Sequence, residues 1–142
     1  MSLTVAESPD SVRLTADRAV AALQRRRITL FARIDHAAGA KSVGLELPDE
    51  QLLIFGDPKA GTPLMQDDPT MGYELPLRLL VWDVGGQTMV GYRRPVEVAQ
   101  DFTLVNRSQI LERMNAFLTE LVAECTATTV PTTGVANGEQ QM

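Results

Sequence analysis

Leu52 to Gln66 reads LLIFGDPKAGTPLMQ and joins an apolar run to two helix-start signals. The run Leu52–Phe55 lies between polar residues and Gly56, which is typical of a central strand buried on both faces. Asp57-Pro58 and Thr62-Pro63 then each place a capping side chain before a proline, as at a helix N-terminus. The stretch therefore predicts a buried strand followed at once by a short helix.

The turn between this strand and helix is a candidate anion site. A strand that runs directly into a helix N-terminus exposes backbone N–H groups at the positive end of the helix dipole. Lys59 lies in the turn and could neutralise a bound anion. The spacing of Gly56 and Gly61 is not that of a phosphate-binding loop, so a purely structural role for Lys59 is the alternative. The same two glycines predict strained backbone or close approach to another segment.

The composition fits one globular domain. The 142 residues are 44% hydrophobic and 22% charged, which is close to the average for such domains. No apolar run approaches the roughly 20 residues of a membrane-spanning helix. The N-terminus lacks the basic and apolar regions of a secretory signal. The sequence therefore predicts a soluble, cytoplasmic protein with no membrane partner.

Charge and cysteine content exclude several classes of ligand. The net charge of -5 opposes general affinity for nucleic acid. Cys125 is the single cysteine and His36 the single histidine, so an intramolecular disulfide is impossible and zinc-site spacing is lacking. We expect no metal, no cofactor and no nucleic-acid partner.

Upstream of the central stretch, strand and helix patterns alternate. Leu3–Glu7 has the pattern of a short strand. Ser11 can cap a helix whose apolar residues recur from Val12 to Leu23 at three-and-four spacing. Ile28–Ile34 alternates strand-forming residues and predicts a second strand.

Downstream, the clearest pairing is a hairpin. Leu77–Val84 and Thr88–Arg93 flank the turn residues Gly85-Gly86-Gln87. The order of elements lacks the regular βαβ repetition of a nucleotide-binding sheet. We therefore predict an α+β fold, a single compact domain with a mainly antiparallel sheet covered by helices.

A long helix is predicted near the C-terminus, capped by Asn106 or Ser108. Its apolar stripe runs from Ile110 to Cys125, which predicts that Cys125 is a buried, inert thiol rather than a reactive one. Because no apolar periodicity continues from Thr126, residues 1–125 are predicted to form the domain and residues 126–142 a disordered tail.

The width of this stripe also predicts a homodimer. Leu118 and Val122 both belong to it, and together they exceed what one contact surface needs. Apolar surface left exposed on a monomer is commonly covered by a twofold interface, here expected on this helix. A monomer in which the stripe covers the sheet completely is the alternative.

Three longer motifs stand in order along the chain, namely Phe31–Ala40, Leu53–Gln66 and Leu75–Trp82. They resemble the domain of unknown function 302 family, over roughly Leu3 to Val98. The resemblance implies a compact α+β domain of the TT1751-like fold. It implies no particular activity, since the family's chemistry is unsettled.

The chain departs from the family pattern at three places. The family's usual Gly-Asn-Pro is Gly56-Asp57-Pro58, and its tyrosine-asparagine-aspartate-proline after the hairpin is Tyr92-Arg93-Arg94-Pro95. Arg27 stands where relatives commonly carry glycine. The first two departures change charge, and Asp57 would repel an anion at the helix start.

Asp35-His36 is the candidate pair for acid–base chemistry. A carboxylate beside an imidazole can fix its tautomer and raise its pKa. Adjacent strand residues point to opposite faces, however, so the alternative is a strand-end histidine bonded to nearby backbone.

Two functions follow from these candidates. The first is a non-catalytic module that binds a small polar or anionic ligand, or a partner protein, in a groove between Asp35-His36 and Gly56–Pro63. The candidate ligand-binding residues are His36, Gly56, Asp57, Lys59, Gly61 and Thr62. The alternative is an enzyme that uses His36 as general acid or base, oriented by Asp35 or Asp57. A pocket that holds His36, Asp57 and Lys59 together would favour the enzyme.

Overall fold

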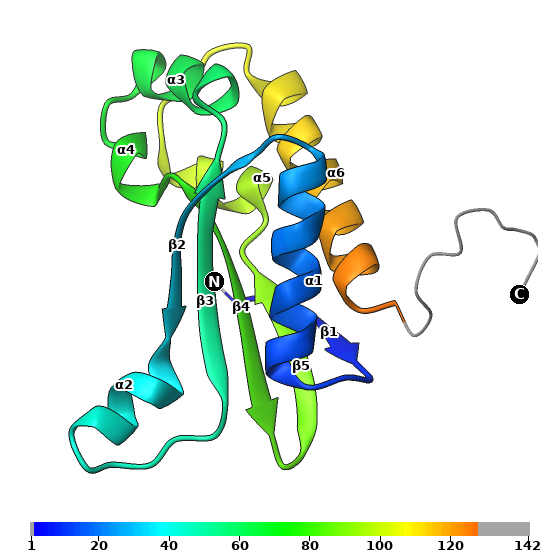
Figure 1. Ribbon diagram of the computed structural model, residues 1–142. Helices are drawn as coiled ribbons and strands as arrows, with labels where there is room; N and C mark the ends of the chain where they lie inside the picture. Colours follow the sequence, from blue (N-terminus) through cyan, green and yellow to red (C-terminus); the bar gives the residue numbers. More distant parts are fainter. Residues whose placement is uncertain (1, 128–142) are drawn as a thin grey trace, which may run out of the picture.

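The computed structural model describes residues 2–127 and shows an α+β domain in which helices pack on a five-stranded sheet (Figure 1). The strands are β1 (Thr4–Ser8), β2 (Thr29–Asp35), β3 (Glu50–Gly56), β4 (Leu77–Val84) and β5 (Gln87–Tyr92). The helices are α1 (Val12–Arg25), α2 (His36–Ser42), α3 (Pro58–Asp67), α4 (Met71–Glu74), α5 (Pro95–Val98), the 3-10 helix η1 (Ala99–Asp101) and α6 (Ser108–Cys125). The predicted fold class is confirmed.

The sheet is antiparallel throughout, with strand order β1-β5-β4-β3-β2. β4 and β5 form the predicted hairpin. Its loop is Gly85-Gly86, whose φ angles of 57° and 90° cost glycine little because it has no Cβ. Val84 pairs with Gln87, so Gln87 begins the second strand instead of belonging to the turn.

The central strand β3 is covered on one face only. Leu53 and Phe55 are fully buried, whereas Leu52 and Ile54, which point to the other face, are partly exposed. The prediction of a strand buried on both faces is therefore wrong. The run is apolar throughout, but α1 and α6 lie on the same side of the sheet (Figure 1).

The main core lies between the sheet and the pair α1 and α6. Ala16, Ala19 and Ala22 are fully buried on α1, and their small side chains allow close packing. On α6, Leu118 and Leu121 are also buried, so the expected exposure of this stripe in a monomer is wrong. The stripe is used within the chain itself, and a dimer contact centred on Leu118 has no exposed surface to use.

Two residues other than glycine have a positive φ among those described, Arg27 at 57° and Asn106 at 55°. Asparagine adopts this left-handed conformation more readily than arginine does. α6 begins just after, with Arg107 in the cap position and no capping side chain. The expected caps Asn106 and Ser108 are therefore wrong.

Thr126 and Ala127 are the first two residues of the predicted tail. The Thr126 hydroxyl donates to the Val122 carbonyl at 2.7 Å, and Arg18 donates to the Ala127 carbonyl at 3.1 Å. The remainder, residues 128–142, lies outside the described part of the chain, so the disorder of the tail stays a prediction.

Candidate ligand-binding pocket

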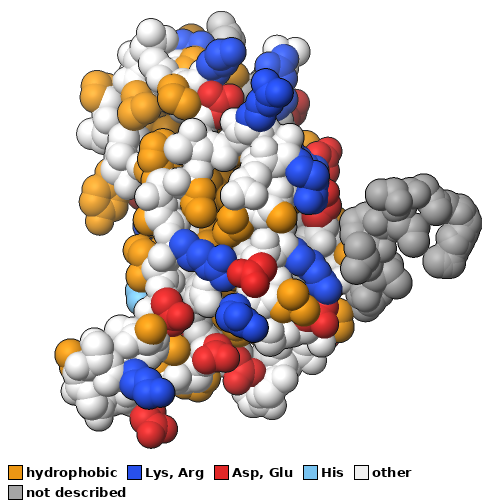
Figure 2. Space-filling view, in the orientation of Figure 1, with side chains coloured by type: hydrophobic (Ala, Val, Ile, Leu, Met, Phe, Trp, Pro, Cys, Tyr) orange, Lys and Arg blue, Asp and Glu red, His pale blue; other side chains and the backbone are white. Residues whose placement is uncertain are grey.

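A pocket of about 610 Å³ opens where β3 ends and α3 begins. Residues of α3 and α6 line it. Figure 1 shows α3 at the end of the sheet opposite α2. Hydrophobic side chains gather over α3 and the adjoining strand ends in Figure 2. The apolar lining of the pocket consists of Ile28, Phe31, Pro58, Ala60, Met65, Leu75, Pro76, Leu77, Ile110, Met114 and Phe117.

The floor of this pocket is the predicted strand-to-helix turn. Asp57 caps α3, and its Oδ1 accepts a hydrogen bond from the Lys59 backbone N–H at 3.0 Å. Pro58 is the first helical residue, so the first of the two predicted helix starts is the correct one. Thr62-Pro63 lies inside the helix. The Asp57 carboxylate therefore occupies the position where an anion was expected to bind.

Gly56 and Gly61 both line the pocket, but neither has a positive φ. The expectation of strained backbone is therefore wrong at both. A Cβ on Gly56 would lie 3.4 Å from Pro76 Cβ, and one on Gly61 would lie 3.4 Å from Leu75 Cδ1. These are ordinary contact distances, so close approach to another segment does not require glycine at either position.

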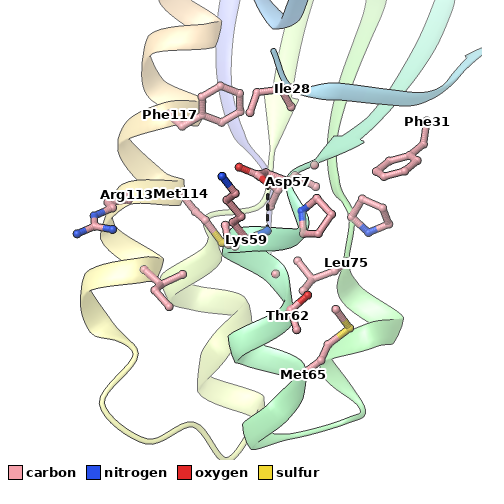
Figure 3. Close-up of a pocket in the computed structure, with 17 residues that line it drawn as sticks. Ile28, Phe31, Asp57, Lys59, Thr62, Met65, Leu75, Arg113, Met114 and Phe117 are labelled. Atoms are coloured by element: carbon pink, nitrogen blue, oxygen red, sulfur yellow. Dashed lines mark hydrogen bonds between the residues drawn. The ribbon is translucent and has the colours of Figure 1, made fainter. Parts of the chain in front are cut away.

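Two cations stand beside the apolar lining. Figure 3 shows Lys59 extending from α3 towards α6, and Arg113 directed outward from α6. No carboxylate within residues 2–127 forms an ion pair with Lys59. Its ammonium group is thus available to a ligand, with Asp57 as the neighbouring acidic group (Figure 3). Thr62 supplies a hydroxyl on the same helix.

An ion pair joins the C-terminal end of α3 to the cap residue of α6. Asp67, at the end of α3, accepts hydrogen bonds from Arg107 Nε at 2.8 Å and Arg107 Nη2 at 3.0 Å. The Val105 backbone N–H also donates to Asp67, at 2.9 Å. Chiefly because of the Arg107 hydrogen bonds, the pKa of Asp67 falls to about 2. Asp68 accepts from the Thr103 N–H at 3.1 Å, so the segment before α6 is fastened to α3.

His36 and Asp35 lie at the other end of the sheet. Because β2 and β3 are antiparallel, Thr29 pairs with Gly56 while Asp35 pairs with Gln51. Asp35 caps α2 through its Oδ1, which accepts from the Ala38 N–H at 2.8 Å, and His36 is exposed. The structure thus brings together Gly56, Asp57, Lys59, Gly61 and Thr62 but separates them from His36. The condition that would favour an enzyme is not met.

The sequence reasoning missed the residues that make the pocket walls. Met114 and Phe117 belong to the apolar stripe of α6 and were assigned to packing. The sequence feature that reflects their place in the pocket is the excess width of the stripe, from which a dimer contact is predicted instead. Phe31, which is 56% exposed, also indicates the pocket, because a large aromatic residue is unusual on the polar face of an alternating strand.

The architecture defines the class of protein, an α+β domain in which helices cover one face of an antiparallel sheet. Within that class, the chain belongs to the family described as Domain of unknown function DUF302, whose model matches residues 4–121. A crystal structure of an uncharacterized conserved protein DUF302 from Bacillus stearothermophilus has a TM-score of 0.78 to this fold. The match covers 88% of this chain and 98% of that chain at 17% sequence identity.

Curated relatives share more sequence but are longer. Proteins named Fluoride-specific ion channel FluC 1, from Brucella suis and Brucella abortus, are each 43% identical over 103 residues, or 72% of this chain. The match covers 41% and 38% of their respective lengths, so the chain spans about two fifths of these relatives. Within residues 2–127, no helix has both the length and the apolar character needed to cross a bilayer.

Proposed function

We propose that this protein is a non-catalytic binding module for a small amphipathic ligand, with an apolar body and one anionic group. The observation that carries this proposal is the apolar pocket of about 610 Å³ with Lys59 beside it. Pockets of roughly 300 to 1,000 Å³ lined by hydrophobic side chains, with few polar groups, are the usual form of small-molecule sites. The sequence predicts a polar or anionic ligand. The apolar walls of the pocket favour an anionic ligand whose remaining part is hydrophobic.

The apolar walls favour burial of a chain or ring. Phe31, Met65, Met114 and Phe117 offer two aromatic rings and two flexible thioethers, and methionine adapts readily to ligands of different shape. A strongly hydrated ion would lose its water shell here without replacement donors. Fluoride, which the name of the Brucella proteins mentions, therefore fits this pocket poorly and serves as a negative control.

Lys59 is the group proposed to hold the anionic end. Its side chain rises from the start of α3, beside Asp57 and Met114 (Figure 3). The capped helix start contributes little, because the Asp57 carboxylate already accepts the Lys59 N–H there. The described ionisable residues of the lining are Asp57, Lys59 and Arg113, and none of them forms a nucleophile–base or acid–base pair in hydrogen-bond contact. A binding role is therefore favoured over the enzyme alternative.

We also propose that the module acts as a homodimer in the cytoplasm. Support for self-association comes from apolar sheet surface that lies outside the pocket and away from α6. The cytoplasmic location stays a prediction from the sequence.

Calorimetric titration with decanoate, decanol and sodium fluoride tests the ligand class. Decanoate and decanol share one apolar chain, and only decanoate carries the charge. We expect both to bind, decanoate more tightly, and fluoride not to bind. Lys59→Gln should weaken the affinity for decanoate by about 3- to 10-fold, which corresponds to the loss of a partly exposed charge-assisted hydrogen bond. The affinity for decanol should not change.

The matched control is Lys41→Gln on exposed α2, which should change neither affinity. Equal affinities for decanoate and decanol would contradict the anionic group. Failure of both to bind would contradict the apolar body, and fluoride binding that Lys59→Gln abolishes would replace the proposal with a halide site.

A further inference from the structure

The sheet face opposite α1 and α6 is apolar and incompletely covered. Its outward side chains include Val5, 46% exposed, Ile34, 39% exposed, and Leu3, 38% exposed. Leu52 on β3 and Leu80 on β4, two of the three inner strands, are partly exposed as well. We call this surface the open face.

The pairing register arranges the open face in rows across the strands. One row is entirely apolar and runs Val5, Gly91, Leu80, Leu52 and Ile34, each residue paired with the next. This central row crosses all five strands. A sheet face with such a row normally packs against a second layer.

The rows on either side of the central row carry opposite charges. Towards the pocket end, Arg78 pairs with Ile54, and Arg93 lies two residues beyond Gly91. Glu74 forms ion pairs with both arginines, at 3.9 Å to Arg78 and 3.5 Å to Arg93, so this row holds two cationic side chains beside one carboxylate.

Towards the α2 end, the next row holds Glu7, Met89, Trp82 and Glu50, each paired with the next. Its two carboxylates make this row acidic. The apolar central row therefore separates a basic end of the open face from an acidic end.

We propose that a second copy of this chain packs on the open face, with the twofold axis running across the strands along the central row. This axis places the basic row of each copy over the acidic row of the other, so Arg78 lies next to Glu50 of the second copy. An axis along the strands would place the basic rows on one another, which electrostatics disfavours. The interface is isologous and closes as a dimer.

The open face is large enough for such an interface. Five strands about 4.8 Å apart, with six residues of about 3.3 Å rise each, present roughly 500 Å² of flat area per copy. Two copies bury at least about 1,000 Å² together, the size at which specific interfaces begin. Packed sheets of this kind lie about 10 Å apart with their side chains interdigitated.

Sedimentation equilibrium of the full chain, across about 1 to 100 µM, measures the association. We expect a mass near twice 15.5 kDa that falls on dilution. Trp82 is the single tryptophan and lies in the proposed contact, so its emission should shift to the red over the same dilution. A mass of 15.5 kDa at every concentration would overturn the proposal.

Charge reversal tests the orientation of the two copies. Arg78→Glu and Glu50→Arg should each weaken the dimer at least tenfold, because each places like charges opposite one another. An equal mixture of the two variants should recover a dimer, since both pairs are then complementary. Both residues are at least partly exposed, so each variant should keep the circular dichroism of the wild type.

Arg13→Glu, a charge reversal on the exposed side of α1, is the matched control and should remain dimeric. A dimer unaffected by either single variant would place the contact elsewhere. Weakening without recovery in the mixture would overturn the orientation. Decanoate binding, measured on the same variants, should not change, so failure of the interface is distinguishable from failure of the pocket.

Discussion

At the scale of single residues, Arg27 has a backbone conformation that its side chain does not favour. Arg27 has a φ of 57°, in the left-handed region that glycine adopts most easily, which fits the expectation from the family resemblance that glycine is common at this position. The turn from α1 into β2 requires left-handed backbone there. The Ile28 N–H reaches back to the Leu23 carbonyl at 3.0 Å, which closes the helix end.

Arg27→Gly is therefore expected to stabilise the protein by about 0.5 to 1 kcal/mol, because it removes the clash of Cβ in left-handed backbone. Urea unfolding should show a higher midpoint with an unchanged slope. Arg27→Ala, which keeps the Cβ, is the control and should give no such gain. A midpoint that stays the same or falls for Arg27→Gly would show that the turn carries no strain.

Cys125 is expected to be inert in the folded protein. It is fully buried, and burial raises the pKa of its thiol to about 12, which leaves almost no thiolate at neutral pH. A thiol reagent should modify Cys125 slowly in buffer and rapidly in urea. A Leu45→Cys variant, with the new thiol at a 65% exposed position, should react rapidly in buffer. Equal rates for Cys125 in both solvents would contradict its burial.

Asp57→Asn should tighten decanoate binding about threefold, since a neighbouring unit charge in a watery environment is worth about 1 kcal/mol or less. Asparagine caps helices as well as aspartate does, so the free energy of unfolding should stay within about 0.5 kcal/mol. Decanol affinity is the internal control and should not change. Equal effects on both ligands would mean that Asp57 acts through the shape of the pocket.

At the scale of elements, Asp67 and Arg107 join the end of α3 to the start of α6, the two helices that line the pocket. The pKa of Asp67 is about 2 in the folded protein, below its ordinary value of 3.8. A carboxyl whose folded pKa is depressed stabilises the fold above its unfolded pKa and loses that contribution as pH falls through the folded value. The contribution is therefore complete at pH 7 and disappears between about pH 4 and pH 2.

Asp67→Asn should consequently lower the melting temperature at pH 7, and the difference from the wild type should shrink as pH falls below 4. Asp101→Asn, which removes an exposed carboxylate on η1, is the control and should leave the melting temperature unchanged at pH 7. A difference that persists unchanged at pH 2 would mean that the substitution acts through packing rather than through charge.

Local patterns predicted the elements well, because caps, turns and periodicity are properties of neighbouring residues. Ser11, Asp57 and the Gly85-Gly86 loop each act as predicted. The candidate site was only half predicted. The direction of β2 relative to β3 depends on how the chain returns through α2, and the periodicity of the sequence does not predict that direction. Because the two strands are antiparallel, His36 and Lys59 lie at opposite ends of the sheet.

Considered as a whole molecule, the domain uses its sheet asymmetrically. One face forms the core with α1 and α6, one end forms the pocket, and the other face is proposed to meet a second copy. The sequence could not distinguish these uses, because a stripe of apolar residues looks the same whether it packs in a core, lines a pocket or meets a partner. Met114, Phe117 and Leu118 are consecutive members of one stripe with different roles.

The position of α6 has a consequence for synthesis on the ribosome. This helix lies at the far end of the described chain, yet Leu118 and Leu121 fill the core against α1, and Met114 completes the pocket. A nascent chain that has released α1 to β5 alone still exposes the covered face of its sheet. Folding must therefore wait until Cys125 has left the exit tunnel, and contacts that span about a hundred residues slow it further. During translation, the growing polypeptide consequently exposes part of this apolar sheet face until α6 has emerged.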